Sequence, residues 1–267
     1  MTLVNGHPAE SVDALDRGLA YGDGVFRTLR TEAGQPLWWR DQYAKLAADC
    51  EALMLACPDE ALLRTEVCRV AAAGEGVAKI MITRGAGARG YALPVGEACT
   101  RIVLSAPLPE HAQAPADITA RWCTLRLARQ PRLAGIKHLN RLENVLARAE
   151  WDDPAIFEGL LCDDSGAVVG GVMSNLVIAK AGELFTPDLG QCGVAGVART
   201  RLLRAMERRG IPLRIGRLLP DAILAADEVM LCNSVIGVRR VGRLDDVTWT
   251  PAGWTPILND ALYEDVD

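Results

Sequence analysis

The chain has 267 residues, half of them hydrophobic, and a formal net charge of −5. That length can form one large domain or two compact ones. The acidic balance disfavours nucleic acid or an anionic membrane as the main partner, and no apolar run approaches the length of a membrane span. The eight cysteines and three histidines show no metal-ligand spacing, so no metal centre is expected. Because the first twenty residues lack the pattern of a secretory signal, we expect a cytoplasmic protein.

The first part of the chain, residues 1–106, has the pattern of an α+β domain. The run V-F-R-T-L-R is followed by a turn and then by Q-P-L-W-W, which is typical of a β-hairpin. The other elements predicted here are strands at 1–5, 77–83 and 101–106 and helices at 42–55 and 60–73.

Residues 107–116 contain three prolines and no periodicity, which predicts an interdomain linker. The larger domain, 117–267, combines α+β and α/β character. It begins with a strand and is rich in strands between 159 and 187. The elements predicted in it are strands at 118–127, 228–232 and 238–243 and helices at 199–209 and 256–263.

One lysine lies beside the best-marked helix of the chain. Residues 132–150 read R-L-A-G-I-K-H-L-N-R-L-E-N-V-L-A-R-A-E, and the apolar residues after Lys137 recur at helical spacing. Asn140 followed by Glu143 has the form of a capping box, so we predict that the helix starts at Asn140. Lys137 would then lie on a short non-helical entry to this helix.

Lysine is rare in the sequence, which contains Lys45, Lys79, Lys137 and Lys180. Arginine stays protonated and cannot form an imine, so an aldehyde cofactor would have only these four candidates. By itself, Lys137 is more simply interpreted as a solvated residue before a helix.

Six motifs in order resemble those of one enzyme family. They are D-R-G-L-A-Y-G-D-G-V-F at 16–26, I-T-R-G-A-G-A-R-G-Y at 82–91, A-G-I-K-H-L-N-R-L-E-N-V-L-A-R at 134–148, L-F-T-P at 184–187, G-V-A-G-V-A-R at 193–199 and C-N-S-V-I-G-V-R-R-V at 232–241. Together they resemble the 4-amino-4-deoxychorismate lyases, which are fold-type IV pyridoxal 5′-phosphate (PLP) enzymes related to branched-chain and D-amino acid aminotransferases. The resemblance implies a two-domain fold-type IV structure, PLP bound covalently at Lys137, and a homodimer with the cofactor between the domains.

The resemblance also implies a phosphate site for PLP. The sequence G-V-A before a helix can present unpaired N–H groups to a phosphate, although alone it would be an ordinary turn. By resemblance, the amides of Val197 and Ala198 bind the phosphate and the Ser234 hydroxyl reaches it. Lys45 stands where the family commonly has an arginine, so this anchor keeps its charge but loses the bidentate fork.

The acidic partner of the pyridine nitrogen is missing from its usual place. Relatives have a glutamate in a V-x-E-G-x-x-S-N-L segment, but here the segment reads V-V-G-G-V-M-S-N-L, with Gly170 at that position. If the preceding hairpin is tight, Gly170 lies opposite Leu160, while Asp163 and Asp164 lie at the turn and are too distant to substitute. Gly170→Glu is then predicted to strengthen the electron sink, provided that the side chain fits.

Substrate binding is predicted for three residues and a catalytic role for one more. Arg84 and Arg89 flank a glycine-rich loop in which a guanidinium could bind a substrate carboxylate, although either could equally be a solvated surface residue. Asn233, by resemblance, belongs to the substrate site, and Thr28 aligns with a threonine near the reacting centre of the lyases.

Three functions follow, in order of preference. The first is a PLP-dependent 4-amino-4-deoxychorismate lyase, which releases pyruvate from an anionic substrate and forms 4-aminobenzoate for folate synthesis. The second is a class IV aminotransferase, because fold alone does not determine function. The third is a catalytically impaired PLP-binding homologue, which the glycine at position 170 suggests.

Overall fold

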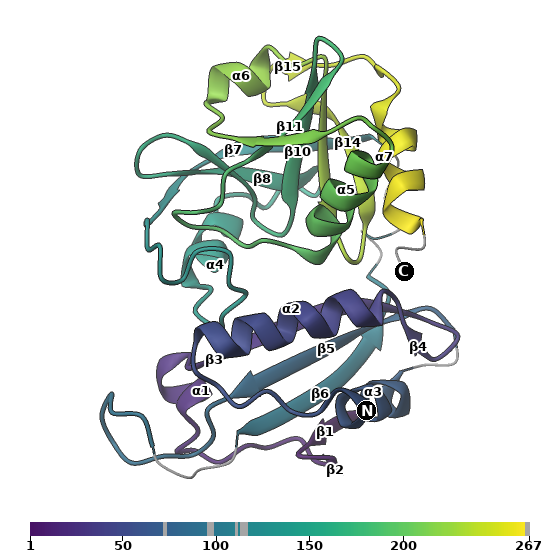
Figure 1. Ribbon diagram of the computed structural model, residues 1–267. Helices are drawn as coiled ribbons and strands as arrows, with labels where there is room; N and C mark the ends of the chain where they lie inside the picture. The colour runs from purple at the N-terminus through teal and green to yellow at the C-terminus, as the bar shows by residue number, and fades with distance from the viewer. Residues whose placement is uncertain (72–73, 95–98, 110–111, 113–116, 265–267) are drawn as a thin grey trace. The chain divides into compact units, whose positions relative to one another are not determined.

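The computed structural model describes residues 1–71, 74–94, 99–109, 112 and 117–264. The chain divides into two compact units, Met1–Pro109 with Ile136–Asn140, and Glu110–Gly135 with Arg141–Asp267 (Figure 1). The sequence-based domains place Lys137 in the C-terminal domain, whereas these contacts group Ile136–Asn140 with the first unit. Most of the predicted linker at 107–116 lies outside the described residues.

The first unit is built on a six-stranded antiparallel sheet with the order β2-β1-β6-β5-β3-β4. The predicted hairpin is confirmed, because β3 and β4 pair through Thr31 and Pro36. The elements of this unit are β1 (Thr2–Val4), β2 (His7–Pro8), α1 (Arg17–Tyr21), β3 (Gly24–Glu32), β4 (Gln35–Pro36), α2 (Trp39–Ala52), α3 (Glu60–Val70), β5 (Gly76–Thr83) and β6 (Thr100–Pro107).

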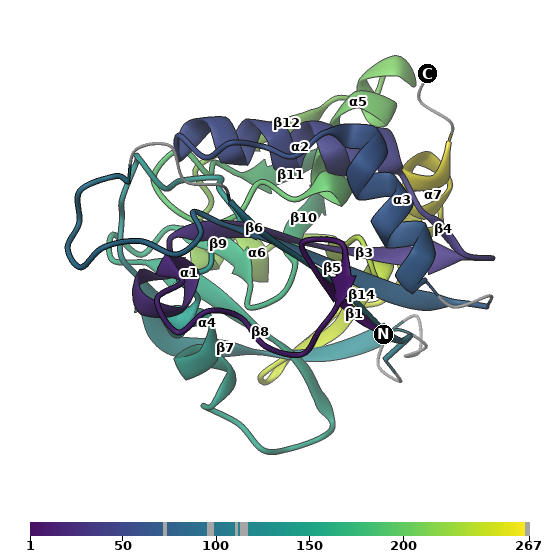
Figure 2. The ribbon, with the colours of Figure 1, turned by 90° about the horizontal axis from the view of Figure 1, so that it is seen from below.

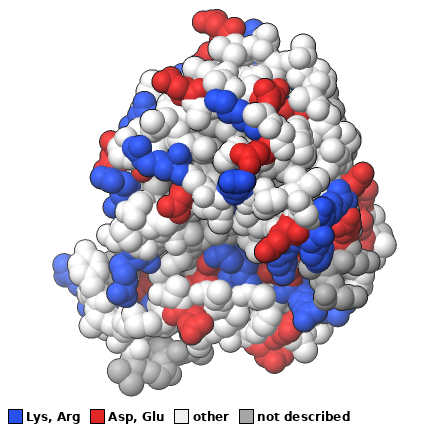
Figure 3. Space-filling model, turned by 45° about the horizontal axis from the view of Figure 1, so that its top comes forward, with Lys and Arg blue, Asp and Glu red and all other residues white. Residues whose placement is uncertain are grey.

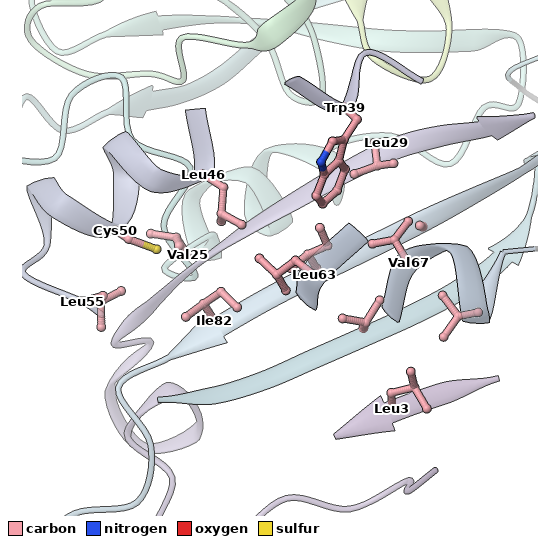
Figure 4. Packing of buried hydrophobic residues seen from close by; sticks show 14 of the residues in the cluster. Leu3, Val25, Leu29, Trp39, Leu46, Cys50, Leu55, Leu63, Val67 and Ile82 are labelled. Atoms are coloured by element: carbon pink, nitrogen blue, oxygen red, sulfur yellow. The ribbon is translucent and has the colours of Figure 1, made fainter. Parts of the chain in front are cut away.

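Helices α2 and α3 cover one face of this sheet (Figure 2). Figure 4 shows Leu46 of α2 and Leu63 of α3 packed against Val25 and Leu29 of β3, and all four side chains are fully buried. Because side chains alternate along a strand, Phe26 and Thr28 point to the opposite face. The alternation therefore separates the core face of β3 from a second face that carries polar groups.

The second unit contains a mixed sheet of nine strands among the described residues, with the order β12-β11-β10-β13-β14-β7-β8-β9 and β15 paired to β14. Strand β7 is parallel to both neighbours. The sheet curls, so that β9 at one end of the order also contacts β10 and β11. The strands are β7 (Asp117–Leu127), β8 (Ile156–Asp163), β9 (Val168–Gly171), β10 (Asn175–Lys180), β11 (Glu183–Pro187), β12 (Leu213–Gly216), β13 (Glu228–Asn233), β14 (Gly237–Leu244) and β15 (Val247–Thr248).

The helices of the second unit are α4 (Leu142–Arg148), α5 (Val197–Arg208), α6 (Pro220–Leu224) and α7 (Trp254–Tyr263). The predicted start of α4 is wrong. Its N-cap is Arg141 without a side-chain cap bond, Asn140 Nδ2 donates to the Gly22 carbonyl, and Glu143 Oε1 accepts from Ala128 N. Both residues predicted to form the capping box are therefore used in tertiary contacts that the local pattern does not reveal.

Acidic and basic side chains lie next to one another on the face shown in Figure 3. Several charged residues of the chain form ion pairs within one unit, such as Arg101 with Glu66 at 2.6 Å. Within the described parts of the chain, no helix is long and apolar enough to cross a membrane, and no group of three metal-ligating side chains occurs.

Candidate active site

The lysine segment adds to the edge of β3. Phe26 N donates to the Lys137 carbonyl and Leu139 N donates to the Gly24 carbonyl, both at 2.9 Å, and His138 forms a bridge with Val25. Strand β4 pairs only with the far end of β3, so this stretch of the edge is open to the segment. Lys137 is thus held by main-chain bonds, as expected for a lysine on a non-helical entry to α4.

The Lys137 ammonium lies on the face of the sheet that α2 and α3 do not cover. Its Nζ is 4.6 Å from the centroid of the Phe26 ring, and Lys79 Nζ is 5.1 Å from the same centroid. Thr28 pairs directly with Lys79 across β3 and β5, and therefore shares this face. The structure brings Lys137, Thr28 and Lys79 to one surface. The alternating sequence of β5 placed Lys79 in a strand, but only the pairing with β3 shows its place beside Lys137.

Lys45 lies on α2, where its Nζ forms an ion pair with the Asp49 carboxylate one helical turn later. Burial, together with the positive charge of Arg27, lowers the pKa of Lys45 to about 8. The ammonium is therefore engaged within the first unit, and its contact with a cofactor phosphate stays a prediction.

The predicted phosphate site is the N-terminus of α5. Val197 and Ala198 are the first two helical residues, and the N-cap Gly196 forms no side-chain cap bond. A twelve-residue helix that lacks a side-chain cap presents free N–H groups and the positive end of its dipole to an anion.

Asn175, at the start of β10, holds the loop that leads into α5. Its Oδ1 accepts from Gly196 N at 3.1 Å, and its Nδ2 donates to the Val194 carbonyl at 2.8 Å. A Cβ at position 196 would lie 2.3 Å from Asn175 Oδ1, so only glycine allows this approach. The S-N-L motif and the G-V-A motif are therefore joined in space.

Ser234 lies in the turn between β13 and β14, and β13 packs against α5. Asn233 shapes this turn, because its Oδ1 accepts from Val235 N at 2.8 Å and Ile236 N at 2.9 Å. Its Nδ2 donates to the Met173 carbonyl at 3.2 Å. With its amide engaged in this way, Asn233 positions the Ser234 turn, and its predicted contact with substrate remains untested.

The backbone around Gly170 leaves little space for any side chain. A Cβ on Gly170 would lie 2.9 Å from the backbone carbonyl oxygen of Ser174, and φ is +157°. A side chain would therefore require the backbone to move, so the condition attached to the Gly170→Glu prediction is not met. Gly170 pairs with Leu161 and Gly171 pairs with Leu160, so Gly170 lies within one residue of the predicted position opposite Leu160.

A buried carboxyl group, Glu158 of β8, lies close to this turn. It is fully buried and accepts bonds from Gly159 N (3.0 Å), Val172 N (3.1 Å), Met173 N (3.1 Å) and Ser174 Oγ (2.8 Å). Burial raises its pKa to about 7, against the hydrogen bonds that lower it. By strand alternation Glu158 shares a face with Leu160, opposite to the face of Gly170. It therefore stabilises the turn and does not replace a glutamate at position 170.

Asp163 lies at the hairpin turn as predicted and accepts from Ser165 N and Ala167 N.

Arg84 is engaged within its own unit. Its Nε and Nη2 donate to the two oxygens of Asp23 at 2.8 and 3.0 Å, and it also donates to the carbonyls of Leu53 and Met54 at 2.8 Å. These contacts hold the guanidinium of Arg84, and its predicted role as a substrate ligand stays a prediction. Arg89 is exposed, and its predicted contact with a substrate carboxylate stays a prediction.

A family model for amino-transferase class IV matches residues 24–244. The chain belongs to the amino-transferase class IV family. Among curated relatives it is 34% identical to an aminodeoxychorismate lyase from Vibrio harveyi over 90% of both chains. It is 27% identical to a putative branched-chain-amino-acid aminotransferase from Methanocaldococcus jannaschii over 88% of this chain and 83% of that relative. The crystal structure of 4-amino-4-deoxychorismate lyase from Pseudomonas aeruginosa is 45% identical, covers 100% of both chains and has a TM-score of 0.91.

The class IV site fits PLP in two respects and departs from the family pattern in one. The uncapped N-terminus of α5 suits a phosphate, and Lys137, held by main-chain bonds to β3, lies on the face that carries Thr28. The departure is Gly170, where the backbone leaves no space for the usual glutamate.

Proposed function

We propose that this class IV protein is a PLP-dependent 4-amino-4-deoxychorismate lyase that releases pyruvate and forms 4-aminobenzoate, a precursor of folate. The observation that carries the proposal is the 45% identity to the Pseudomonas aeruginosa lyase over the full length of both chains. The matched aminotransferase from Methanocaldococcus jannaschii is only 27% identical. The eight free cysteines of the chain support a cytoplasmic location.

PLP, when bound, supplies an aldehyde for covalent attachment and draws electrons from the substrate carbon next to the amine. Lys137 would hold the cofactor, and its Nζ would then take the proton from C4 of the substrate as general base. The amides of Val197 and Ala198, with the hydroxyl of Ser234, would hold the phosphate. On the face of Lys137, Thr28 would supply a hydroxyl near the reacting carbon.

The glycine at position 170 favours the lyase over an aminotransferase. A carboxylate beside the pyridine nitrogen strengthens the electron-drawing power of the cofactor, and this chain has no space for it at the usual place. Formation of an aromatic product is strongly downhill, so a lyase depends less on that power than an aminotransferase does. If neither pyruvate release nor amino transfer is observed, the chain is a catalytically impaired PLP-binding homologue.

The direct test is to incubate the purified holoenzyme with aminodeoxychorismate and to quantify both products. We expect pyruvate and 4-aminobenzoate to appear in equal amounts, because one substrate molecule yields one of each. If neither product forms although PLP is bound, the chain is the catalytically impaired homologue.

We also propose that two copies of the chain form a homodimer. The apolar stripe of α4 remains exposed, with Leu142, Val145 and Leu146 at 76%, 59% and 60% exposure. Such a stripe predicts a helix packed on an apolar partner, and exposed apolar clusters mark interaction sites. A second copy of this chain is the occupant that the family resemblance implies.

Replacing Leu142, Val145 and Leu146 together with glutamine should weaken the dimer by at least roughly a hundredfold, since burial of each side chain contributes about 1.5–3 kcal/mol. Sedimentation velocity across a concentration series measures this change. Leu62→Gln on α3, a residue 43% exposed, is the matched control and should leave the dimer intact. An unchanged dimer in the triple variant would show that α4 lies outside the interface.

A further inference from the structure

The backbone of Lys137 is held from two sides. On one side its carbonyl accepts from Phe26 N of β3 at 2.9 Å. On the other side its own N–H donates to Asp49 Oδ2 of α2 at 3.2 Å. A helix that packs on the sheet thus contributes one side chain to the segment that carries the proposed catalytic lysine.

Asp49 is 1% exposed and lies between two cations of the first unit. The Arg27 guanidinium binds Oδ2, the same oxygen that accepts from Lys137, and the Lys45 ammonium binds Oδ1. Arg27 Nε has no hydrogen-bond partner among the described residues, and burial lowers the pKa of Arg27 to about 9. A buried charge requires a paired and well-oriented partner, so this carboxylate is held firmly in one position.

The position of Asp49 bears on which way the lysine points. Arg27 lies on the face of β3 that α2 covers, whereas Phe26 and the Lys137 ammonium lie on the other face. A slip of one residue in the pairing of an extended segment would turn its side chains to the opposite faces. A fixed acceptor for the N–H of Lys137 therefore opposes such a slip and keeps the ammonium over Phe26.

We infer that Asp49, oriented by Arg27, is a positioning residue that sets the register of the lysine segment on β3 and directs Lys137 toward the cofactor. The inference rests on the proposed role of Lys137. Asp49 touches neither substrate nor cofactor in this account and acts through the backbone of the lysine.

The experiment measures covalent capture of PLP and requires no turnover. Each apo-protein is mixed with PLP, reduced with borohydride at timed intervals, and digested for peptide mass spectrometry. The main variant is Arg27→Leu with Asp49→Leu, which removes the acceptor without leaving the guanidinium unpaired. Asp49→Asn, which keeps an oxygen acceptor, is the conservative variant. Glu66→Leu with Arg101→Leu removes another, partly buried ion pair of the same unit and is the matched control.

In the wild type we expect the adduct on Lys137. In Arg27→Leu with Asp49→Leu, adduct formation at Lys137 should slow by at least about tenfold, because a small misplacement of a reacting group is costly. Part of the adduct should move to Lys79, whose Nζ lies over the same Phe26 ring. Asp49→Asn should recover much of the rate at Lys137, and the Glu66 and Arg101 control should behave as the wild type does.

Two outcomes distinguish a failure of the positioning role of Asp49 from a failure of the proposed active site. If the wild-type adduct forms on a lysine other than Lys137, the proposed active site is wrong. If the wild type labels Lys137 and both Asp49 variants label it at the same rate and with the same selectivity, the positioning role is wrong. Should the double variant not fold, as judged by circular dichroism, Asp49→Ala decides: this variant removes the acceptor, and labelling of Lys137 at the wild-type rate and with the wild-type selectivity would overturn the inference.

Discussion

Lys137→Ala should abolish release of pyruvate from aminodeoxychorismate. The variant lacks both the amine that holds PLP and the base that removes the substrate proton. Loss of a general base alone costs roughly 10²–10⁴-fold in rate. Lys79 lies over the same Phe26 ring, but its backbone is fixed on β5 by the pairing with Thr28, so it does not occupy the position of Lys137. Borohydride reduction of the variant with PLP should leave no adduct in the peptide that contains position 137.

Lys180→Ala provides the matched control. Lys180 is the exposed last residue of β10, next to the turn at Ala181 and Gly182. Its removal should change neither the rate of pyruvate release nor the amount of adduct. A Lys137→Ala variant with wild-type activity would place the catalytic lysine elsewhere in the chain.

Glu158→Ala should lower the free energy of unfolding far more than removal of an exposed carboxylate does. The N–H groups of Gly159 and Met173 and the Ser174 hydroxyl would lose the acceptor that Glu158 supplies, whereas Val172 N also donates to the Gly159 carbonyl at 2.9 Å. Each buried group left without a partner costs about 1–3 kcal/mol, so the free energy of unfolding should fall by more than about 3 kcal/mol. Chemical denaturation measures this loss. Glu183→Ala, which breaks an exposed pair with Arg214, should cost no more than about 1 kcal/mol.

The loss caused by Glu158→Ala should also depend on pH. Burial raises the pKa of Glu158 to about 7 from its ordinary value of 4.5. A carboxyl group with a raised pKa in the folded state contributes stability that is present below pH 4.5 and is lost as the pH rises through 7. The difference between wild type and variant should therefore be larger at pH 5 than at pH 8, by up to about 3 kcal/mol. An equal loss at both values would mean that Glu158 stays ionised throughout.

Much of the fold could be predicted because local patterns agree with the final structure. The hairpin of β3 and β4 follows from a turn between two apolar runs, and α5 ends where Gly210 adopts a φ of +72°. Helix α4 shows the limit of such patterns. Asn140 and Glu143 have the spacing of a capping box, but tertiary contacts with Gly22 and Ala128 use their side chains.

The parts of the candidate site that are formed by the backbone of one short segment could be predicted from the sequence. The parts formed by side chains far apart in the sequence could not. A glycine before a helix indicates the N-terminus of α5 as an anion site, and the structure shows it without a side-chain cap. The pairing of Asp49 with Arg27 joins residues 22 positions apart, and no local pattern marks it. The same holds for the pairing of Arg84 with Asp23. These residues are 61 positions apart in sequence, so no local pattern marks their contact.

The most direct test of the proposed function compares two reactions of one preparation of the wild-type holoenzyme. One assay supplies aminodeoxychorismate and follows pyruvate and 4-aminobenzoate. The other supplies amino acids with 2-oxo acids and follows amino transfer. A lyase should give a kcat/KM for pyruvate release well above that for any amino transfer. Efficient amino transfer with no pyruvate from aminodeoxychorismate would contradict the lyase and identify an aminotransferase.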